Sequence, residues 1–290
     1  MTTEQAPVEA SAAGTITIGG DMTVNRMGFG AMRITGEGIW GPPKDHDNAI
    51  RVLKRAVELG VNFIDTADAY GPNVSEDLIA EALHPYPTGL VIATKGGLLR
   101  TGPGQWPNNG KPEHLREALE GSLRRLKIDT IDLYQYHRPD PNVPIEDSIG
   151  MLVDLQKQGK IRHIGVSNFN SAQLAQARAI AAIVSVQNRY NVSDREDEDV
   201  LETCTRDGIA FLPWAPVASG DLTRPGGPVD KAAEHHKATQ GQIALAWLLQ
   251  RSPLVLPIPG TAQIAHLEEN IAAAALKLDD DELKALNNPS

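Results

Sequence analysis

Hydrophobic and polar positions follow two different patterns along this chain. Short, almost wholly apolar runs alternate with longer stretches in which apolar residues recur every three to four positions. The short runs predict buried strands, and the longer stretches predict amphipathic helices. Strands are predicted at residues 26–30, 62–66, 90–95, 131–137, 161–167, 183–188, 209–215 and 254–260. Helices are predicted at residues 46–60, 75–84, 112–127, 145–159, 170–181, 196–208, 239–252 and 262–275.

The order of these elements predicts an α/β fold, a closed (β/α)₈ TIM barrel formed by one domain at residues 15–290. An open dinucleotide-binding sheet would need a Gly-x-Gly-x-x-Gly turn that opens a helix, but "MGFGAM" runs into a loop. Alternating β-branched residues around Gly19 and Gly20 predict a β-hairpin that caps the N-terminal end of the barrel. The small and polar residues 1–14 are expected to form a disordered leader.

Composition narrows the cellular setting. The net charge of −10 argues against a general surface for nucleic acid or anionic membranes. A single cysteine, Cys204, allows no intramolecular disulfide, and we expect its thiol to be buried or half-buried in a helix. The sequence shows neither a membrane-spanning apolar run nor a secretory signal. We therefore expect a soluble, cytoplasmic protein, either a monomer or a weak homo-oligomer.

Four polar residues stand at or just after the ends of successive predicted strands: Asp65, Tyr70, Lys95 and His137. The carboxyl ends of parallel barrel strands meet at one mouth, where barrel enzymes carry their chemistry. A tyrosine with a pKa near 10 is a sluggish acid, but a neighbouring ammonium lowers that pKa. Asp65 would hold Lys95 in place, and His137 would hydrogen-bond a substrate oxygen. The pattern predicts proton transfer to or from a carbonyl or alcohol oxygen.

Two long connections follow predicted strands, at about residues 100–111 and 217–231, and we expect both to shape the substrate pocket. The residues expected to face the substrate are Trp40, Tyr70, Trp106, His137 and Arg138, with Trp214 as a further wall. Aromatic walls suit a small, flat carbonyl compound. The adjacent His235 and His236 lack further ligands at a suitable spacing, so we expect a solvated helix face and no metal site.

Several motifs, in order and at matching spacing, closely resemble the aldo-keto reductases from about Met27 to the last helix. They are "GVNFIDTADAYG", "IATKGG", "IDLYQYHRPDP", "GKIRHIGVSNF" and "IPGTAQIAHLEEN". The resemblance implies a barrel that binds a nicotinamide dinucleotide across its mouth. It also implies that Asp65, Tyr70, Lys95 and His137 form a catalytic tetrad, with Tyr70 as the general acid in the reversible reduction of an aldehyde or ketone.

The same resemblance assigns cofactor contacts. The nicotinamide end would be held by Gly30, Ala31, Met32, Asp65, Ser167, Asn168, Gln187, Trp214, Ala215 and Pro216. Amide and hydroxyl groups suit a carboxamide that both donates and accepts, and an indole offers a stacking face. The adenosine end would be held by Ile258, Pro259, Gly260, Thr261, Gln263, His266, Glu269 and Asn270. A helix that starts after Thr261 could offer backbone N–H groups to phosphate.

One departure bears on the choice of cofactor. Many aldo-keto reductases carry a lysine and an arginine where this chain has Gly260 and His266. Those cations pair with the 2′-phosphate of NADPH, so this chain lacks two charge-assisted contacts. NADP(H) remains the favoured cofactor on the family resemblance, with NAD(H) as the alternative.

The resemblance leaves the substrate open. The stretches "GFGAMRITGEGIWGPPKD" and "SVQNRYNVSDRE" look like the bacterial pyridoxal reductase branch, which makes pyridoxal the specific alternative to generic carbonyl reduction. Channel-associated β-subunits also resemble this family. A nicotinamide-binding regulatory or redox-sensing subunit is therefore the alternative from another functional class.

Overall fold

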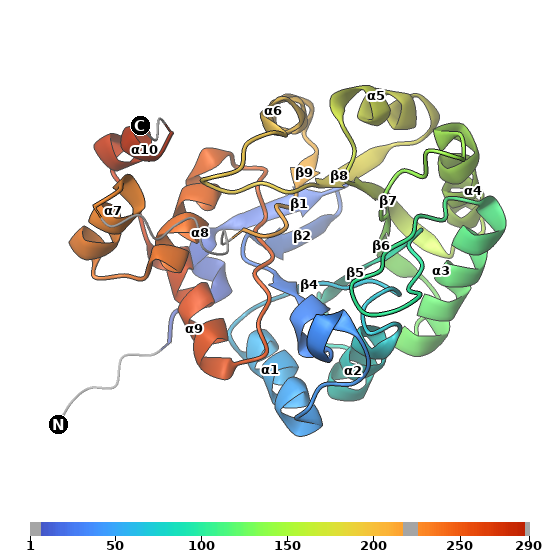
Figure 1. Ribbon diagram of the computed structural model, residues 1–290, viewed down its shortest axis with the longest axis horizontal. Coiled ribbons are helices and arrows are strands. Elements are labelled where there is room, and N and C mark those ends of the chain that lie inside the picture. Colours follow the sequence, from blue (N-terminus) through green and yellow to red (C-terminus); the bar gives the residue numbers. More distant parts are fainter. Residues whose placement is uncertain (1–6, 217–225, 288–290) are drawn as a thin grey trace.

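A curled parallel sheet lies at the centre of the molecule (Figure 1). This computed structural model describes residues 7–216 and 226–287, and within them seven strands pair in sequence order. They are β3 (Phe29–Gly30), β4 (Phe63–Asp65), β5 (Val91–Gly96), β6 (Ile131–Tyr136), β7 (Ile161–Ser167), β8 (Ile183–Gln187) and β9 (Ala210–Phe211). Neighbouring strands are all parallel, so their carboxyl ends share one edge. That edge forms the mouth.

The strand predicted at residues 254–260 closes the barrel without forming a regular ladder. It makes one bridge to β9, and on its other side Gly28 N donates to Pro257 O at 2.9 Å. Gly30 N donates to Pro259 O at 3.3 Å. Neither proline has an N–H to return, which explains why the pairing stays one-sided here. The predicted (β/α)₈ arrangement is thus confirmed, with an irregular eighth segment.

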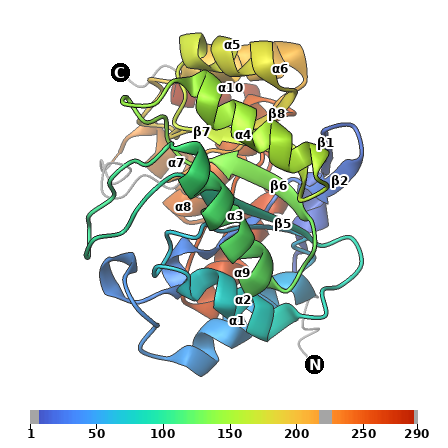
Figure 2. The same ribbon diagram turned by 90° about the vertical axis from the view of Figure 1, so that its right-hand side faces the viewer.

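Helices cover the outer face of the sheet, and Figure 2 shows α3 and α4 lying across it. They are α1 (His46–Glu58), α2 (Val74–Leu83), α3 (Pro112–Leu126), α4 (Ile145–Lys157), α5 (Ser171–Ile180), α6 (Glu198–Asp207), α8 (Gln240–Arg251) and α9 (Ile264–Ala272). Two further helices, α7 (Pro228–His236) and α10 (Asp280–Asn287), pack against each other. Within the described residues, every helix is too short or too polar to cross a lipid bilayer.

Helix α7 corrects the predicted long connection at residues 217–231. The helix begins at Pro228, inside the range predicted to be a loop, and a proline at the first helical position is already held near the helical φ. The part of that connection at residues 217–225 lies outside the described residues.

The hairpin of β1 (Thr15–Ile18) and β2 (Met22–Asn25) caps the N-terminal end of the barrel, as predicted. Its inward side chains alternate with exposed ones and are buried in one cluster with side chains from the barrel strands, among them Phe63 and Leu133. The hairpin therefore fills the end of the barrel that lies opposite the mouth.

The leader expected at residues 1–14 is not disordered throughout. Residues Ala10–Ala13 form a 3-10 turn, and Ala10 N donates to Leu59 O at 2.8 Å. Ala10 is fully buried in the same cluster as the apolar face of α1, so burial of small apolar side chains orders this segment. Residues 1–6 lie outside the described residues.

Cys204 is buried in α6, as the sequence predicted. Burial raises the pKa of its thiol to about 12. The reactive thiolate is therefore disfavoured, and the residue serves as an apolar core side chain.

Candidate active site

Lys95 organises the polar groups at the mouth. Its side chain is fully buried on β5, and its Nζ donates to Asp65 Oδ2 at 2.6 Å and to Thr66 O at 2.8 Å. A third contact of 3.3 Å runs from Nζ to the hydroxyl oxygen of Tyr70. These contacts use the three donors of an ammonium, so Lys95 is held in one position between a carboxylate and a phenol.

Asp65 is fixed from its other side by two amides. Its Oδ1 accepts from Gln135 Nε2 at 3.1 Å and from Gln187 Nε2 at 2.8 Å. Gln187 is among the residues expected to hold the cofactor, and here it lies at the end of β8 with its amide on Asp65. Gln135 was not among the predicted site residues, although an uncharged polar residue near the end of the strand was a signal.

His137 faces Tyr70 across the mouth. Their ring centroids are 5.8 Å apart with an interplanar angle of 82°. Burial, together with the positive charges of Lys95 and Arg138, lowers the pKa of His137 well below its ordinary value. The imidazole is therefore neutral at pH 7. Its Nδ1 is buried without a hydrogen-bond partner among the described residues.

The pKa of Tyr70 is raised, contrary to the expectation that a neighbouring ammonium would lower it. Burial raises this pKa above its ordinary value, and the opposing attraction of Lys95 does not compensate for burial. Burial also disfavours the ammonium of Lys95, but the charge of Asp65 and the contact with Tyr70 outweigh it and raise the pKa of Lys95. In this state the phenol holds its proton beside a charged ammonium, which is the arrangement of a proton donor.

A second hydrogen-bonded group borders His137. Trp214 Nε1 donates to Asn168 Oδ1 at 3.2 Å, and Asn168 Nδ2 donates to His137 O at 2.9 Å. Ser167 Oγ donates to Gln187 O at 2.7 Å. The half-exposed indole, the amides and the hydroxyl thus lie together beside the polar centre. Their chemistry fits a flat ring that carries a carboxamide.

Ala215 and Pro216, the neighbours of Trp214, were also expected to contact the cofactor. Ala215 is exposed, and its carbonyl accepts from Asn191 Nδ2 at 3.1 Å. Pro216 is buried and precedes the undescribed residues 217–225. Both positions continue the rim that Trp214 begins.

The closing segment passes close to β3. Gly30 pairs with Asp65 in the sheet, and Ala31 and Met32 follow in a 3-10 turn, which places all three at the mouth. A Cβ on Gly260 would lie 2.3 Å from Gly30 O. Position 260 therefore cannot accept the lysine found in the family that the sequence resembles unless the main chain moves.

Helix α9 holds the other residues expected at the adenosine end. Thr261 Oγ1 accepts from Gln263 N at 3.1 Å, immediately before the helix starts. His266 is exposed and Asn270 half-buried. The carboxylate of Glu269 accepts from the hydroxyl that caps α8 at 2.6 Å. Glu269 therefore also ties α9 to α8.

Arg100 joins the two predicted tryptophan walls. Its guanidinium carbon lies 3.6 Å from the ring centroid of Trp106 and 5.5 Å from that of Trp40. Its Nη1 donates to Ala69 O at 3.0 Å. Trp106 in turn meets the ring of Tyr70 edge-on, with centroids 6.4 Å apart. From the sequence, Arg100 was expected only to begin a long loop, because nothing local showed that two tryptophans meet there.

Two buried carboxyl groups, Asp68 and Glu76, follow the carboxyl end of β4. Glu76 is fully buried, where it pairs with Arg125 Nε at 2.6 Å and accepts from Thr94 Oγ1 at 2.6 Å. Burial, with the nearby charge of Glu76, raises the pKa of Asp68 to about 8. Asp68 therefore carries a proton over most of the neutral range.

Comparisons with known proteins show which family the chain belongs to. An uncharacterized oxidoreductase of Schizosaccharomyces pombe is 51% identical over 280 residues, covering 97% of this chain and 91% of the relative. Pyridoxine 4-dehydrogenase of Escherichia coli is 43% identical over 278 residues, covering 93% and 96%. An aldo/keto reductase of Klebsiella pneumoniae, solved with NADP and acetate, has a TM-score of 0.78 at 26% identity, covering 94% and 93%. The model of the aldo/keto reductase family matches residues 26–288, and the chain therefore belongs to that family.

Proposed function

We propose that this oxidoreductase reduces an aldehyde or ketone to the alcohol with NADPH, and that the reaction is reversible. The observation that carries the proposal is the buried contact of Lys95 Nζ with both the Tyr70 hydroxyl, at 3.3 Å, and Asp65, at 2.6 Å. Such an arrangement poises a phenol to give its proton to a substrate oxygen.

Each of the four residues at the mouth has a separate role in the reaction. Tyr70 donates its hydroxyl proton to the carbonyl oxygen, and the ammonium of Lys95 stabilises the phenolate that remains. Asp65 keeps Lys95 charged and in position through the 2.6 Å contact. His137, neutral because its pKa is lowered, hydrogen-bonds the substrate oxygen and orients it toward Tyr70. The alcohol oxidation uses the same groups in reverse.

A bound nicotinamide would supply the hydride. Ser167, Asn168 and Gln187 would hold its carboxamide, and the half-exposed Trp214 would stack on the ring. The NADP-bound relative from Klebsiella pneumoniae supports NADP(H) as the cofactor. NAD(H) is the alternative, because Gly260 and His266 replace two cations that contact the 2′-phosphate in other family members.

The specific substrate in this proposal is pyridoxal. The 43% identity with a pyridoxine 4-dehydrogenase supports it, as do the two tryptophans, Trp40 and Trp106, stacked on Arg100 beside Tyr70. Aromatic walls suit a flat heterocyclic aldehyde. A cytoplasmic site of action, as a monomer or weak homo-oligomer, completes the proposal.

Tyr70→Phe tests the reaction. We expect kcat to fall by at least about 100-fold while NADPH still quenches tryptophan fluorescence, because only the proton donor is removed. Tyr86→Phe is the matched control; its hydroxyl donates to Leu126 O far from the mouth, so turnover should persist. Unchanged turnover in Tyr70→Phe would contradict the mechanism. A wild-type protein that binds NADPH and turns over no carbonyl would favour the regulatory alternative.

A carbonyl panel run with both cofactors tests the finer assignments. We expect pyridoxal to give a higher kcat/KM than simple aliphatic aldehydes, and NADPH a higher value than NADH. Good turnover of simple aldehydes without pyridoxal turnover would exclude the pyridoxal assignment and leave the reaction class intact.

A further inference from the structure

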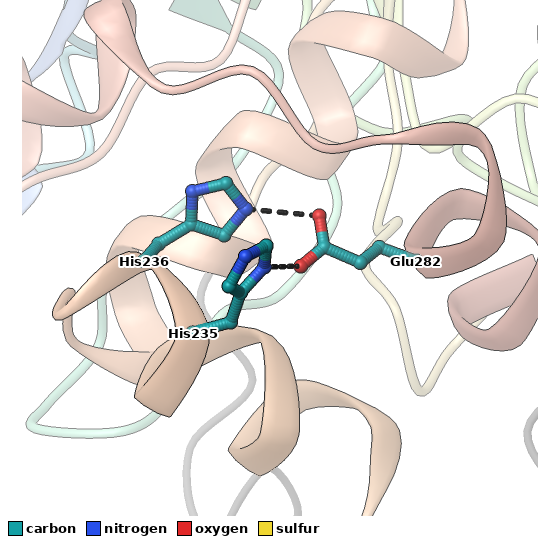
Figure 3. Close-up of side chains that lie close together, drawn as sticks. All are labelled: His235, His236 and Glu282. Atoms are coloured by element: carbon teal, nitrogen blue, oxygen red, sulfur yellow. Dashed lines mark hydrogen bonds and ion pairs between the residues drawn. The ribbon is translucent and has the colours of Figure 1, made fainter.

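Two imidazoles and one carboxylate meet outside the barrel, where α10 packs against α7 (Figure 3). His235 Nδ1 lies 2.8 Å from Glu282 Oε1, and His236 Nε2 lies 2.9 Å from Glu282 Oε2. One ligand atom from each of the three residues lies within 4.8 Å of the others. The sequence offered only the histidine pair, since Glu282 follows His236 by 46 positions.

The three groups form a set that zinc binds elsewhere in proteins. Two imidazole nitrogens and one carboxylate oxygen are a standard ligand set, with water in the fourth position. Ligand atoms around a tetrahedral zinc ion stand roughly 3.3 Å apart for bonds of about 2.0–2.1 Å. The two imidazole nitrogens contact different oxygens of the carboxylate, at 2.8 and 2.9 Å, and the three ligand atoms lie within 4.8 Å of one another, so a side-chain shift is needed to bring all three around one ion. His235 can make that shift because its side chain is 66% exposed.

The surroundings hold the carboxylate in place and favour a cation. The backbone N–H of Asp279 donates to Glu282 Oε2 at 2.9 Å, and Glu282 N donates to Asp279 Oδ1 at 2.8 Å. This reciprocal pair fixes the orientation of the ligand, as outer-shell contacts do in metal sites. Asp280 and Asp281 precede Glu282 in the first turn of α10 and add negative charge.

We propose that His235, His236 and Glu282 form a binding site for one divalent transition-metal ion of the zinc class. The ion would replace the two histidine–carboxylate hydrogen bonds and would clamp α10 to α7. The site is distinct from the mouth of the barrel, because α7 and α10 lie at the outer edge of the molecule (Figure 1). Imidazole nitrogen is a softer ligand than oxygen, so it favours Zn²⁺ over Mg²⁺ or Ca²⁺, which prefer oxygen ligands.

The test is calorimetric titration of the full, untagged chain, stripped with a chelator, against ZnCl₂ and separately against MgCl₂. We expect one Zn²⁺ per chain, no Mg²⁺ binding, and a rise in Tm of about 2–5 °C at saturating Zn²⁺. His235→Gln should abolish both the stoichiometric binding and the Tm rise; its exposed position makes a folding defect unexpected. Glu282→Gln should do the same.

His46→Gln is the matched control. His46 also contacts two carboxylates, Asp47 at 3.5 Å and Glu81 at 3.0 Å, but brings no second imidazole. We expect this variant to bind Zn²⁺ like the wild type. Failure of the wild type to bind at 100 µM Zn²⁺, or undiminished binding by His235→Gln, would overturn the proposal.

Discussion

The ammonium of Lys95 lies 2.6 Å from the carboxylate of Asp65, and the two side chains are 0% and 3% exposed. Removing one of two opposite charges at this depth is costly, because water cannot solvate the charge that remains. The pair therefore affects both the stability of the barrel and the chemistry at its mouth.

Replacing Lys95 with methionine removes the positive charge of this pair. We expect kcat to fall by at least about 100-fold, because the phenolate of Tyr70 loses its stabilising charge. The free energy of unfolding should fall by roughly 3–5 kcal/mol, because Asp65 remains buried without its partner. Carbonyl turnover and urea denaturation measure the two effects. Lys157→Met, at an exposed lysine, should change neither; wild-type turnover in Lys95→Met would contradict the assigned role.

Arg100→Met tests how the tryptophan walls are held. The variant keeps an unbranched apolar stem but loses the guanidinium, and with it the stacking on Trp106 and Trp40 and the hydrogen bond to Ala69 O. Contacts of this kind are worth about 0.5–1 kcal/mol each, so we expect KM for aromatic aldehydes to rise about 3–10-fold with little change in kcat. Steady-state kinetics and tryptophan fluorescence provide the measurements. A fall in kcat at constant KM would instead place Arg100 in the chemical step.

Asp68 makes stability depend on pH. Its pKa is about 8 when folded, whereas an unfolded aspartate ionises near its ordinary value of 3.8. Between these values the folded chain binds the extra proton, so this contribution is full below pH 3.8 and falls as pH rises toward 8. Asp68→Asn should flatten that fall, by up to about 1.4 kcal/mol per pH unit.

Urea denaturation at pH 5, 6.5 and 8 measures the slope for Asp68→Asn. The exposed control Asp147→Asn should keep the wild-type slope, because water solvates its side chain in both states. Equal slopes for wild type and Asp68→Asn would show that Asp68 does not retain its proton on folding.

Gly260 lies so close to Gly30 that a side chain at position 260 should destabilise the fold. Gly260→Ala should lower the free energy of unfolding by about 1–3 kcal/mol, because its Cβ would lie 2.3 Å from Gly30 O. Gly150→Ala is the glycine control; a Cβ there meets nothing within 4 Å, and the helix should gain slightly.

His266→Arg should shift the cofactor preference toward NADPH, whereas position 260 has no room for a cationic side chain. His266 is exposed on α9, so an arginine can be accommodated there. A charge-assisted contact with a 2′-phosphate is worth about 1.5–3 kcal/mol, so the ratio of kcat/KM for NADPH over NADH should rise at least about tenfold. An unchanged ratio would place the adenosine end of the cofactor away from His266.

Much of the architecture could be predicted because it rests on local pattern. Short apolar runs predicted the strands of the barrel, and amphipathic stretches predicted its helices. Alternating β-branched residues predicted the hairpin. Two details of these elements were not predicted. The segment at residues 254–260 has an apolar strand pattern, but two prolines prevent a regular ladder. Helix α7 is only nine residues long, and its first turn was predicted to lie in a loop.

The sequence by itself determined which chemical groups reach the mouth, because the end of a strand fixes where Asp65, Lys95 and His137 must lie. Only the tertiary structure decided what these groups meet. Burial, which depends on the whole barrel, outweighs Lys95 in setting the pKa of Tyr70. Arg100 between two tryptophans, and Glu282 beside two histidines, join residues far apart in the chain. No local pattern encodes such contacts, because packing alone brings these side chains together.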